Sequence, residues 1–399
     1  MGSVAISVNG AVVYSKAVGY SDIESKTPLN IHSKFRIGSI SKMFTTVLIF
    51  KAIEERKLDR QDHLSKYFPL IKNAENITIG NMLNHRSGIH NFTASPDYLS
   101  WNTSAQTEDQ LLARIIAGGS DFEPDSKASY SNSNFVILSM LLEKIYQKSY
   151  KVLLTERIIA PLGIKHTYYG GKIDLKDNEC FSYKYAGGKW VKEPETDMSI
   201  PSGAGAVVSD PEDLDIFISA LFAEKLISAG SLAQMKTIKE GYGMGMFSAP
   251  FGDKKLFGHT GGIDGFTSVL YYEPSDHISV ALTCNAGNFS NNEILIAVLN
   301  SYYGKPFTIP DFTTTNYTPV NLDDYLGTYA SKQVPLKILI TKNEKGLIAQ
   351  ATGQPPLNMT ANKKDVFSFA QAGIVLEFNT TLHQMTLKQG GGTFLFEKE

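Results

Sequence analysis

Ser39-Ile40-Ser41-Lys42 is the stretch from which the fold and chemistry of this 399-residue chain can be worked out. It opens a predicted helix that extends to about Glu55, because apolar side chains recur there with a helical period and few breakers intervene. Ser39 and Lys42 are three residues apart, so they share one helix face with Cβ atoms about 5–6 Å apart. An isolated Ser-x-x-Lys is usually an N-cap followed by a surface lysine, so the rest of the chain must decide its meaning.

Segments that are predicted to form strands lie on both sides of the region that contains this helix. Residues 4–8 and 12–17 flank Asn9-Gly10, a strong hairpin signal because both residues tolerate positive φ. Strand-like runs return at 266–272 and 278–285, whereas about 39–200 is mostly helical. We therefore predict an α+β fold: an antiparallel sheet flanked by helices, with an inserted, mostly helical region and a covering helix at about 292–303.

The chain changes character after residue 305. Residues 306–322 are rich in proline and threonine and are typical of an extended linker. From 323 to 399 short strands alternate with turns, which predicts a small antiparallel all-β domain, either a barrel or a sandwich, of which we expect the barrel. The predicted organisation is thus a first domain at 1–305, with its helical insertion at about 39–200, a linker, and a barrel at 323–399.

Composition excludes several classes of function. A net charge of −2 argues against a nucleic-acid partner. The sequence contains no run of about twenty apolar residues, so no membrane span is predicted. Cys180 and Cys284 lack metal-ligand spacing and are expected to be buried thiols. His85 and His90, the closest histidine pair, do not form a zinc motif. We predict no metal and no cofactor, and the sequence leaves the oligomeric state open.

Tyr130-Ser131-Asn132 lies in a polar loop just before a predicted helix and could be only a capped turn. In the functional interpretation the Tyr130 oxygen lies close to the Lys42 ammonium, which would lower the pKa of the phenol. Tyr130 could then act as general base toward Ser39, or carry the proton to the leaving group. Asn132 would offer its side-chain amide to a substrate carbonyl.

His259-Thr260-Gly261-Gly262 begins a run that becomes a strand at Phe266. Two consecutive glycines indicate close approach of another backbone or a ligand at a strand edge. A substrate could lie alongside this edge and use its main-chain hydrogen bonds. The backbone N–H groups of Ser39 and Gly262 could together form an oxyanion hole. The alternative is a β-bulge or a glycine-rich turn beside a histidine without a function.

The order and spacing of these three elements resemble the serine β-lactamase and penicillin-recognising peptidase superfamily. The chain is most similar to the branch with class C β-lactamases, D-alanyl-D-alanine carboxypeptidases, D-aminopeptidases and esterases, whose middle motif begins with tyrosine. The resemblance covers about residues 4–303, and residues 323–399 resemble an appended lipocalin-like barrel. Supporting stretches are Phe35-Arg36-Ile37-Gly38, residues 83–88, residues 203–213 and Tyr242-Gly243-Met244-Gly245.

The resemblance implies a role for each motif residue. Ser39 is the acylated nucleophile with Lys42 as its partner, Tyr130 the general base and Gly262 the second oxyanion donor. Asn132, His259, Thr260 and Gly261 are the implied substrate-binding residues. His259 departs from the β-lactamase pattern, in which lysine is usual, and a neutral imidazole would bind a substrate carboxylate less firmly.

These observations predict a metal-free serine hydrolase that works through an acyl-enzyme on small peptide or amide substrates that contain D-amino acids. The alternatives are a carboxylesterase, a β-lactamase, and a slowly acylated or inactive cell-wall binding or sensor protein. The chain starts Met1-Gly2-Ser3 without an export signal. We nevertheless expect an exported protein, periplasmic or extracellular, whose signal does not form part of this sequence.

Overall fold

A computed structural model describes all residues except 187, 288, 308, 310–318, 320, 335, 345, 353–355, 370–373, 390 and 391. The chain divides into two compact units, Met1–Gly287 and Asn288–Glu399, which are described separately below. No helix of the described residues is both long and apolar enough to cross a bilayer. Both cysteines are buried thiols, as predicted.

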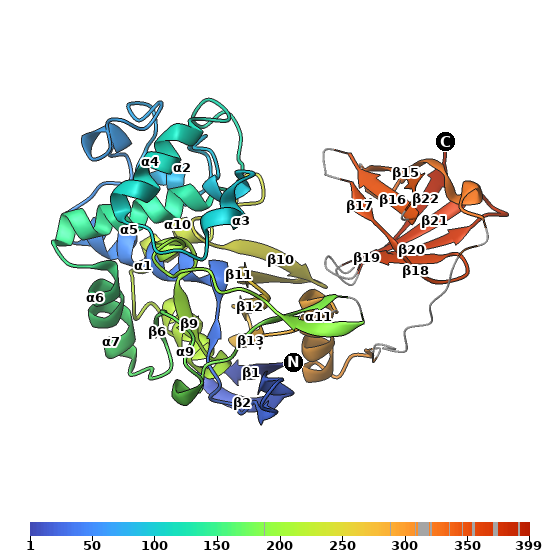
Figure 1. Ribbon diagram of the computed structural model, residues 1–399, viewed down its shortest axis with the longest axis horizontal. Helices are drawn as coiled ribbons and strands as arrows, with labels where there is room; N and C mark the ends of the chain where they lie inside the picture. Colours follow the sequence, from blue (N-terminus) through green and yellow to red (C-terminus); the bar gives the residue numbers. More distant parts are fainter. Residues whose placement is uncertain are drawn as a thin grey trace. The chain divides into compact units, whose positions relative to one another are not determined.

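The first unit is built on a six-stranded antiparallel sheet with strand order β10-β11-β12-β13-β1-β2 (Figure 1). The predicted opening hairpin and the late strands share this sheet, because β1 pairs with β13 and Ala5 lies opposite Ala281. This confirms the predicted fold class. The strands are β1 (Gly2–Val8), β2 (Ala11–Val18), β10 (Phe247–Phe251), β11 (Lys254–Ile263), β12 (Phe266–Glu273) and β13 (Ile278–Cys284).

Helices cover this sheet and form the inserted region. Helix α9 packs against β13 and β1, while α1 lies between the sheet and the remaining helical layer (Figure 1). The helices of this unit are α1 (Ser41–Glu54), α2 (Ile79–Leu83), α3 (Tyr98–Trp101), α4 (Glu108–Gly118), α5 (Asn132–Tyr146), α6 (Tyr150–Leu154), α7 (Ala160–Leu162), α8 (Ser202–Gly205), α9 (Pro211–Phe222) and α10 (Ala229–Met235).

Helix α1 is buried all round. Its first ten residues, Ser41 to Phe50, are all inaccessible to solvent, which is typical of a helix at the centre of a domain rather than on its surface. A lysine in its first turn is therefore carried into the core. A one-turn 3-10 helix, η1 (Gly38–Ile40), leads directly into α1 and contacts β11.

Three small sheets complete the first unit. The strand order β5-β9-β6 joins β5 (Phe35–Arg36), β9 (Val207–Ser209) and β6 (Tyr168–Tyr169). A hairpin is formed by β7 (Tyr183–Ala186) and β8 (Lys189–Lys192), and β3 (Tyr20–Asp22) pairs with β4 (Thr27–Pro28). The first of these sheets leads into η1, so it sets the position of the predicted nucleophile.

The second unit contains a nine-stranded sheet with strand order β17-β16-β15-β14-β22-β21-β20-β19-β18. Its edge strands β17 and β18 follow each other along the chain, so the sheet curls into a nearly closed barrel, as predicted. The strands are β14 (Gly327–Ala330), β15 (Lys337–Asn343), β16 (Gly346–Ala351), β17 (Leu357–Asn358), β18 (Thr360–Lys363), β19 (Val366–Phe369), β20 (Ile374–Asn379), β21 (Gln384–Gln389) and β22 (Gly392–Lys398).

Side chains fill the interior of this barrel. Alternate residues point inward, so Ile338 and Ile340 of β15 are buried while their neighbours are exposed. Helix α11 (Asn291–Tyr302), predicted at about 292–303, also belongs to the second unit, and its place on the first sheet stays a prediction. The predicted linker at 306–322 lies largely outside the described residues. The predicted domain boundaries likewise stay predictions.

Candidate active site

The backbone around Ser39 is fixed by contacts with three strands. The Ile37 N–H donates to the Val207 carbonyl (3.1 Å), and the Ser268 hydroxyl donates to the Ile37 carbonyl (2.8 Å). Gly38 has φ +51°, and a Cβ there would lie 2.7 Å from the Gly262 nitrogen. Only glycine permits both this conformation and this close approach. Ser39 is consequently held against β11 at the start of the buried helix.

Lys42 is completely buried and its amine has three oxygen neighbours. Its Nζ lies 2.9 Å from Ser39 Oγ, 2.8 Å from Asn132 Oδ1 and 2.8 Å from the Ala204 carbonyl oxygen. Burial lowers the pKa of Lys42 well below its usual value of 10.5. Compared with an ordinary lysine, the site thus shifts the equilibrium toward the neutral amine.

The three oxygen neighbours fit either protonation state of the amine, because an ammonium ion could donate to all three and a neutral amine to two of them. The Asn132 amide oxygen and the Ala204 carbonyl can only accept, so they use the two N–H bonds of an –NH₂ group. The lone pair then remains for Ser39, whose hydroxyl can donate. The geometry thus suits Lys42 to take a proton from Ser39, which is what a serine nucleophile requires.

Tyr130 lies immediately before α5 with its ring in an aromatic pocket. The ring centroid is 4.4 Å from that of His85 and 4.9 Å from Lys42 Nζ. Burial raises the pKa of Tyr130, and the opposing effect of its hydrogen bond with Ser39 is smaller. The predicted lowering of this pKa is therefore wrong. The physical reason is that the neighbouring amine is itself desolvated and disfavoured as a cation, while the ring has lost its water.

Asn132 opens helix α5 and is held at three points. Its Oδ1 faces Lys42, its Nδ2 donates to Thr93 Oγ1 (3.0 Å), and its backbone N–H donates to Asn91 Oδ1 (3.0 Å). One amide hydrogen of Nδ2 remains for a substrate, in keeping with the predicted role. The sequence analysis missed Asn91 and Thr93 as supports of the site, since no spacing rule links them to a helix forty residues away.

A cleft of about 760 Å³ opens over these groups. Ser39, Asn132 and Gly262 line it together, so residues more than 200 positions apart in sequence meet at one surface. Apolar or aromatic side chains form one part of the wall, namely Phe92, Tyr98 and Leu99. Charged side chains form another part, namely Lys184, Glu193 and Asp264. A nucleophile at the floor of a mixed apolar and charged cleft is typical of an enzyme acting on small molecules.

Comparison with known proteins agrees with this geometry. The family model described as Beta-lactamase matches residues 2–300. The chain belongs to the Beta-lactamase family. It is a serine hydrolase that contains the Ser-x-x-Lys, Tyr-Ser-Asn and His-Thr-Gly elements in the order expected for its branch.

The chain is similar in sequence or structure to several named proteins. The chain is 24% identical to Penicillin-binding protein 4* of Bacillus subtilis, covering 94% of this chain and 89% of the relative. It is 28% identical to Teichoic acid D-alanine hydrolase of Staphylococcus aureus, covering 74% and 72%. The crystal structure of D-amino acid amidase from Ochrobactrum anthropi SV3, complexed with L-phenylalanine amide, is similar with TM-score 0.63 and 26% identity, covering 72% and 86%.

His259 lies on β11 in this Beta-lactamase family fold, with its ring centroid 6.3 Å from that of Tyr130. The ring is 2% exposed and packs 4.3 Å from the Phe247 ring, and it does not line the cleft. Burial is the main cause that lowers the pKa of His259 to about 3. A neutral, buried imidazole cannot form an ionic contact with a substrate carboxylate, and the substrate-binding role of His259 stays a prediction.

The two glycines that follow have separate positions. Gly261 lies against β5, where a Cβ would come 2.0 Å from the Ile37 carbonyl oxygen, whereas Gly262 lines the cleft and Thr260 is exposed. The predicted close backbone approach thus occurs at Gly261. Only Gly262 lies where its N–H could serve the cleft, and its oxyanion role stays a prediction.

Arg36 is a further residue of the site that the sequence analysis missed. Its buried guanidinium donates to Asp264 Oδ2 (2.8 Å), Glu195 Oε2 (3.2 Å) and the Thr196 and Gly171 carbonyls (both 2.9 Å). These bonds connect β5, just before the nucleophile, to the loop after β11 and to the segment after β8. The position of Arg36 three residues before Ser39 was the available signal.

Proposed function

We propose that this protein hydrolyses small amide or peptide substrates containing D-amino acids through an acyl-enzyme on Ser39. The observation that carries the proposal is the placement of the Lys42 amine, 2.9 Å from Ser39 Oγ and otherwise surrounded by carbonyl oxygens. Burying an amine costs free energy, so this arrangement is not expected of a lysine with a purely structural role and is typical of a functional site.

The reaction follows from the groups around the nucleophile. Ser39 Oγ attacks the substrate carbonyl while its proton passes to the neutral Lys42 amine. The developing oxyanion is stabilised by the backbone N–H groups of Ser39 and Gly262. Tyr130, kept as a phenol by its raised pKa, gives its proton to the leaving amine and is reprotonated from Lys42. Water then attacks the ester carbon and releases the acid, which restores Ser39.

The substrate class is supported by the cleft and by the relatives. Glu193 and Lys184 in its wall offer one negative and one positive charge, which suits a zwitterionic amino-acid or peptide substrate. The names of the relatives include a D-alanine hydrolase and a D-amino acid amidase. Teichoic acid and penicillin targets lie outside the cytoplasmic membrane, so we also propose that this protein is exported.

A carboxylesterase is the second candidate, and the burial of His259 favours it. Without a cation from the His-Thr-Gly element, a substrate carboxylate loses one expected contact, which weakens the case for a β-lactamase or a carboxypeptidase. A slowly acylated binding or sensor protein is the alternative outside enzymology. It would keep Ser39 reactive without releasing the acyl group.

The test combines hydrolysis assays with measurement of the intact mass of the protein after incubation with a penicillin. D-phenylalanine amide, L-phenylalanine amide and 4-nitrophenyl acetate are offered to the wild type, Ser39→Ala and the control Ser25→Ala, whose hydroxyl is exposed and contacts Thr27. We expect hydrolysis of the D-amide in preference to the L-amide, its loss in Ser39→Ala, and its retention in Ser25→Ala.

The other outcomes separate the alternatives. Hydrolysis of the ester alone indicates a carboxylesterase, and a long-lived penicillin adduct without turnover of any substrate indicates a binding protein. Rapid loss of penicillin without an adduct indicates a β-lactamase. Full activity of Ser39→Ala would eliminate the mechanism altogether.

A further inference from the structure

A second cluster of reactive side chains lies at one end of the sheet β5-β9-β6. His32 precedes β5 by three residues, His166 precedes β6 by two, and Asp210 follows β9 directly. Both outer strands are antiparallel to β9, with Phe35 opposite Ser209 and Tyr168 opposite Val208. The beginnings of β5 and β6 therefore meet the end of β9 at one edge, opposite the end that leads to Ser39.

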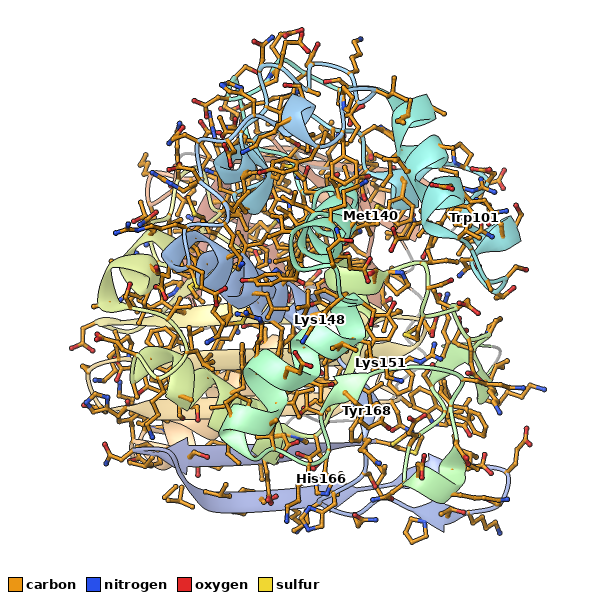
Figure 2. All side chains as sticks on the ribbon, turned by 90° about the vertical axis from the view of Figure 1, so that its left-hand side faces the viewer. Trp101, Met140, Lys148, Lys151, His166 and Tyr168 are labelled. Carbon is orange, nitrogen blue, oxygen red and sulfur yellow. The ribbon has the colours of Figure 1, made fainter. Side chains whose placement is uncertain are left out.

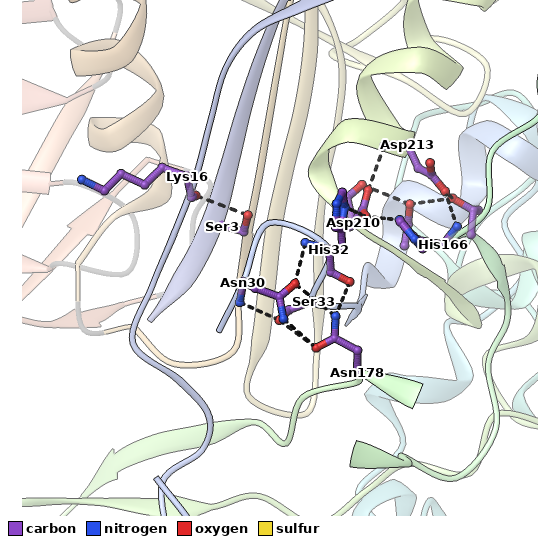
Figure 3. A network of polar contacts seen from close by, with 11 residues as sticks. Ser3, Lys16, Asn30, His32, Ser33, His166, Asn178, Asp210 and Asp213 are labelled. Atoms are coloured by element: carbon purple, nitrogen blue, oxygen red, sulfur yellow. Dashed lines mark hydrogen bonds and ion pairs between the residues drawn. The ribbon is translucent and has the colours of Figure 1, made fainter. Parts of the chain in front are cut away.

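The side chains converge as well as the backbones (Figure 3). His166 Nδ1 lies 2.6 Å from Asp210 Oδ2, and His32 Nδ1 lies 3.9 Å from the same oxygen. One ligand atom from each of the three residues lies within 4.8 Å of the others. Four-coordinate zinc with bonds of about 2.0–2.1 Å separates its ligand atoms by roughly 3.4 Å. Shifts of about 1 Å in the two imidazoles would reach that spacing.

The carboxylate is oriented in advance. Asp210 caps α9, and its Oδ1 accepts from the Asp213 backbone N–H (2.9 Å), which directs Oδ2 toward the histidines. Asp213 in turn accepts from the His166 backbone N–H (2.7 Å) and from Thr167 Oγ1 (2.9 Å). Such outer contacts hold ligands in position in established metal sites.

The two carboxylates of this cluster, Asp210 and Asp213, also favour the binding of a cation. Asp210 is fully buried and Asp213 is 5% exposed, so two carboxylates lie together away from water. In the described part of the chain, no lysine or arginine forms an ion pair with either carboxylate, and the recorded ion pairs of Asp210 are with His32 and His166. Buried carboxylates are normally paired with a cation or coordinate a metal.

We propose that His32, His166 and Asp210 form a binding site for a divalent transition-metal ion of the zinc type. Two imidazoles and one carboxylate suit Zn²⁺, with water at the fourth position, better than they suit Ca²⁺ or Mg²⁺, which prefer oxygen ligands. The histidines are accessible to an incoming ion, with side chains 51% and 32% exposed. Figure 2, which labels His166 and Tyr168, shows both on the side of the molecule turned toward the viewer.

The site would fasten three separate chain segments at the end of the sheet that supports the nucleophile. It needs no part in the hydrolytic reaction, since Ser39 follows β5 at the opposite end. The proposal therefore stands or falls independently of the substrate assigned above.

The experiment measures metal binding directly. The full chain, without a polyhistidine tag and freed of metal by a chelator, is titrated with Zn²⁺ against a chromophoric chelator and separately with Co²⁺. We expect one Zn²⁺ per chain, the intense visible absorption of four-coordinate Co²⁺, and a melting temperature that rises with Zn²⁺. His32→Ala and His166→Ala should each weaken Zn²⁺ binding by at least about tenfold.

The matched control is His90→Ala. His90 Nδ1 lies 2.9 Å from Asp121 Oδ1, so it forms a histidine–carboxylate pair outside the three-residue cluster, and its loss should leave Zn²⁺ affinity unchanged. Equal Zn²⁺ affinity of the wild type and both cluster variants would overturn the proposal. So would the absence of a four-coordinate Co²⁺ spectrum in the wild type, which would leave only an imidazolium–carboxylate pair at this place.

Discussion

At the residue scale, the position of one amine decides the chemistry. Lys42 contacts Ser39 from the first turn of a helix that is buried on every side, so its amine is shielded from water. None of its three hydrogen-bonded neighbours is a carboxylate. The free energy of burial favours the uncharged form. A base strong enough to activate serine is therefore available well below pH 10.5.

The pH dependence of turnover should reveal this amine. As the pH rises through the lowered pKa of Lys42, the neutral form accumulates, so kcat/KM should increase along a single acidic limb. Lys42→Arg, which keeps a permanent positive charge, should lower kcat by about 10²–10⁴-fold. Lys51→Arg in the same helix is the control and should retain activity. A wild-type kcat/KM without an acidic limb at any pH at which the protein stays folded would contradict this role.

Tyr130 should matter most when the leaving group needs a proton. Because burial keeps it a phenol, Tyr130→Phe should slow amide hydrolysis by about 10²-fold or more and affect an activated aryl ester much less. The measurement is kcat on both substrates. Tyr150→Phe, which removes another buried hydroxyl, bonded to Thr45, should lower stability without this difference. Equal losses on amide and ester in Tyr130→Phe would argue for the general-base role instead.

At the scale of elements, the junction between η1 and β11 sets the oxyanion geometry. Gly38→Ala would place a methyl group 2.7 Å from the Gly262 nitrogen in a left-handed conformation, so one strand or the nucleophile must move. We expect a loss of about 10²-fold in kcat, comparable to the loss of an oxyanion donor. The control is Gly163→Ala, which has φ +66° with no atom within 4 Å and so reports the conformational cost alone. Similar kcat for both variants would show that the junction tolerates displacement.

Helix α9 carries a buried acid that weakens its packing on the sheet. Asp215 accepts from Ser7 Oγ on β1 (2.9 Å), and its Oδ1 has no partner among the described residues. Burial raises the pKa of Asp215 well above 3.8, so the folded state holds a proton that the unfolded state releases. Its contribution to stability is complete below pH 3.8 and is lost as the pH rises through the raised pKa.

Asp215→Asn should remove this pH dependence. The amide resembles the protonated acid, so the variant should be more stable than the wild type at pH 8 by about 1–3 kcal/mol and nearly equal to it below pH 3.8. Urea unfolding at several pH values measures the difference. A variant less stable than the wild type at pH 8 would mean that Asp215 is charged and well paired in the folded protein.

At the scale of the whole molecule, each compact unit has a core of its own. One cluster of buried residues includes Phe44 on α1, and another includes Phe367 on β19. We therefore expect each unit to unfold in a cooperative transition of its own.

Calorimetry should show two transitions that respond to different substitutions. Phe367→Ala should destabilise the barrel by about 3–5 kcal/mol, because it leaves a cavity in a small core, and should leave acylation of Ser39 intact. Phe44→Ala is the reciprocal control and should lower the other transition. A single transition that both substitutions shift would show that the two units unfold together.

Local sequence signals predicted most of the architecture. Asn9-Gly10 fixes a hairpin, the apolar period after Ser39 fixes a helix, and the short strands after residue 323 fix a barrel, because each depends on neighbouring residues. Of the motif residues, Ser39, Asn132 and Gly262 line the cleft and His259 does not, and the predicted roles stay predictions. The partners Asn91, Thr93 and Arg36 escaped prediction, since their contacts join segments up to about 230 residues apart and have no local pattern.

The sequence by itself determined the kinds of groups in the site and their order along the chain. Only the tertiary structure decided their protonation, because the pKa of a side chain depends on how much water the fold leaves around it. Burial lowers the pKa of Lys42 and of His259 and raises the pKa of Tyr130. The convergence of His32, His166 and Asp210 was likewise decided by strand register, which no spacing of those three residues could show.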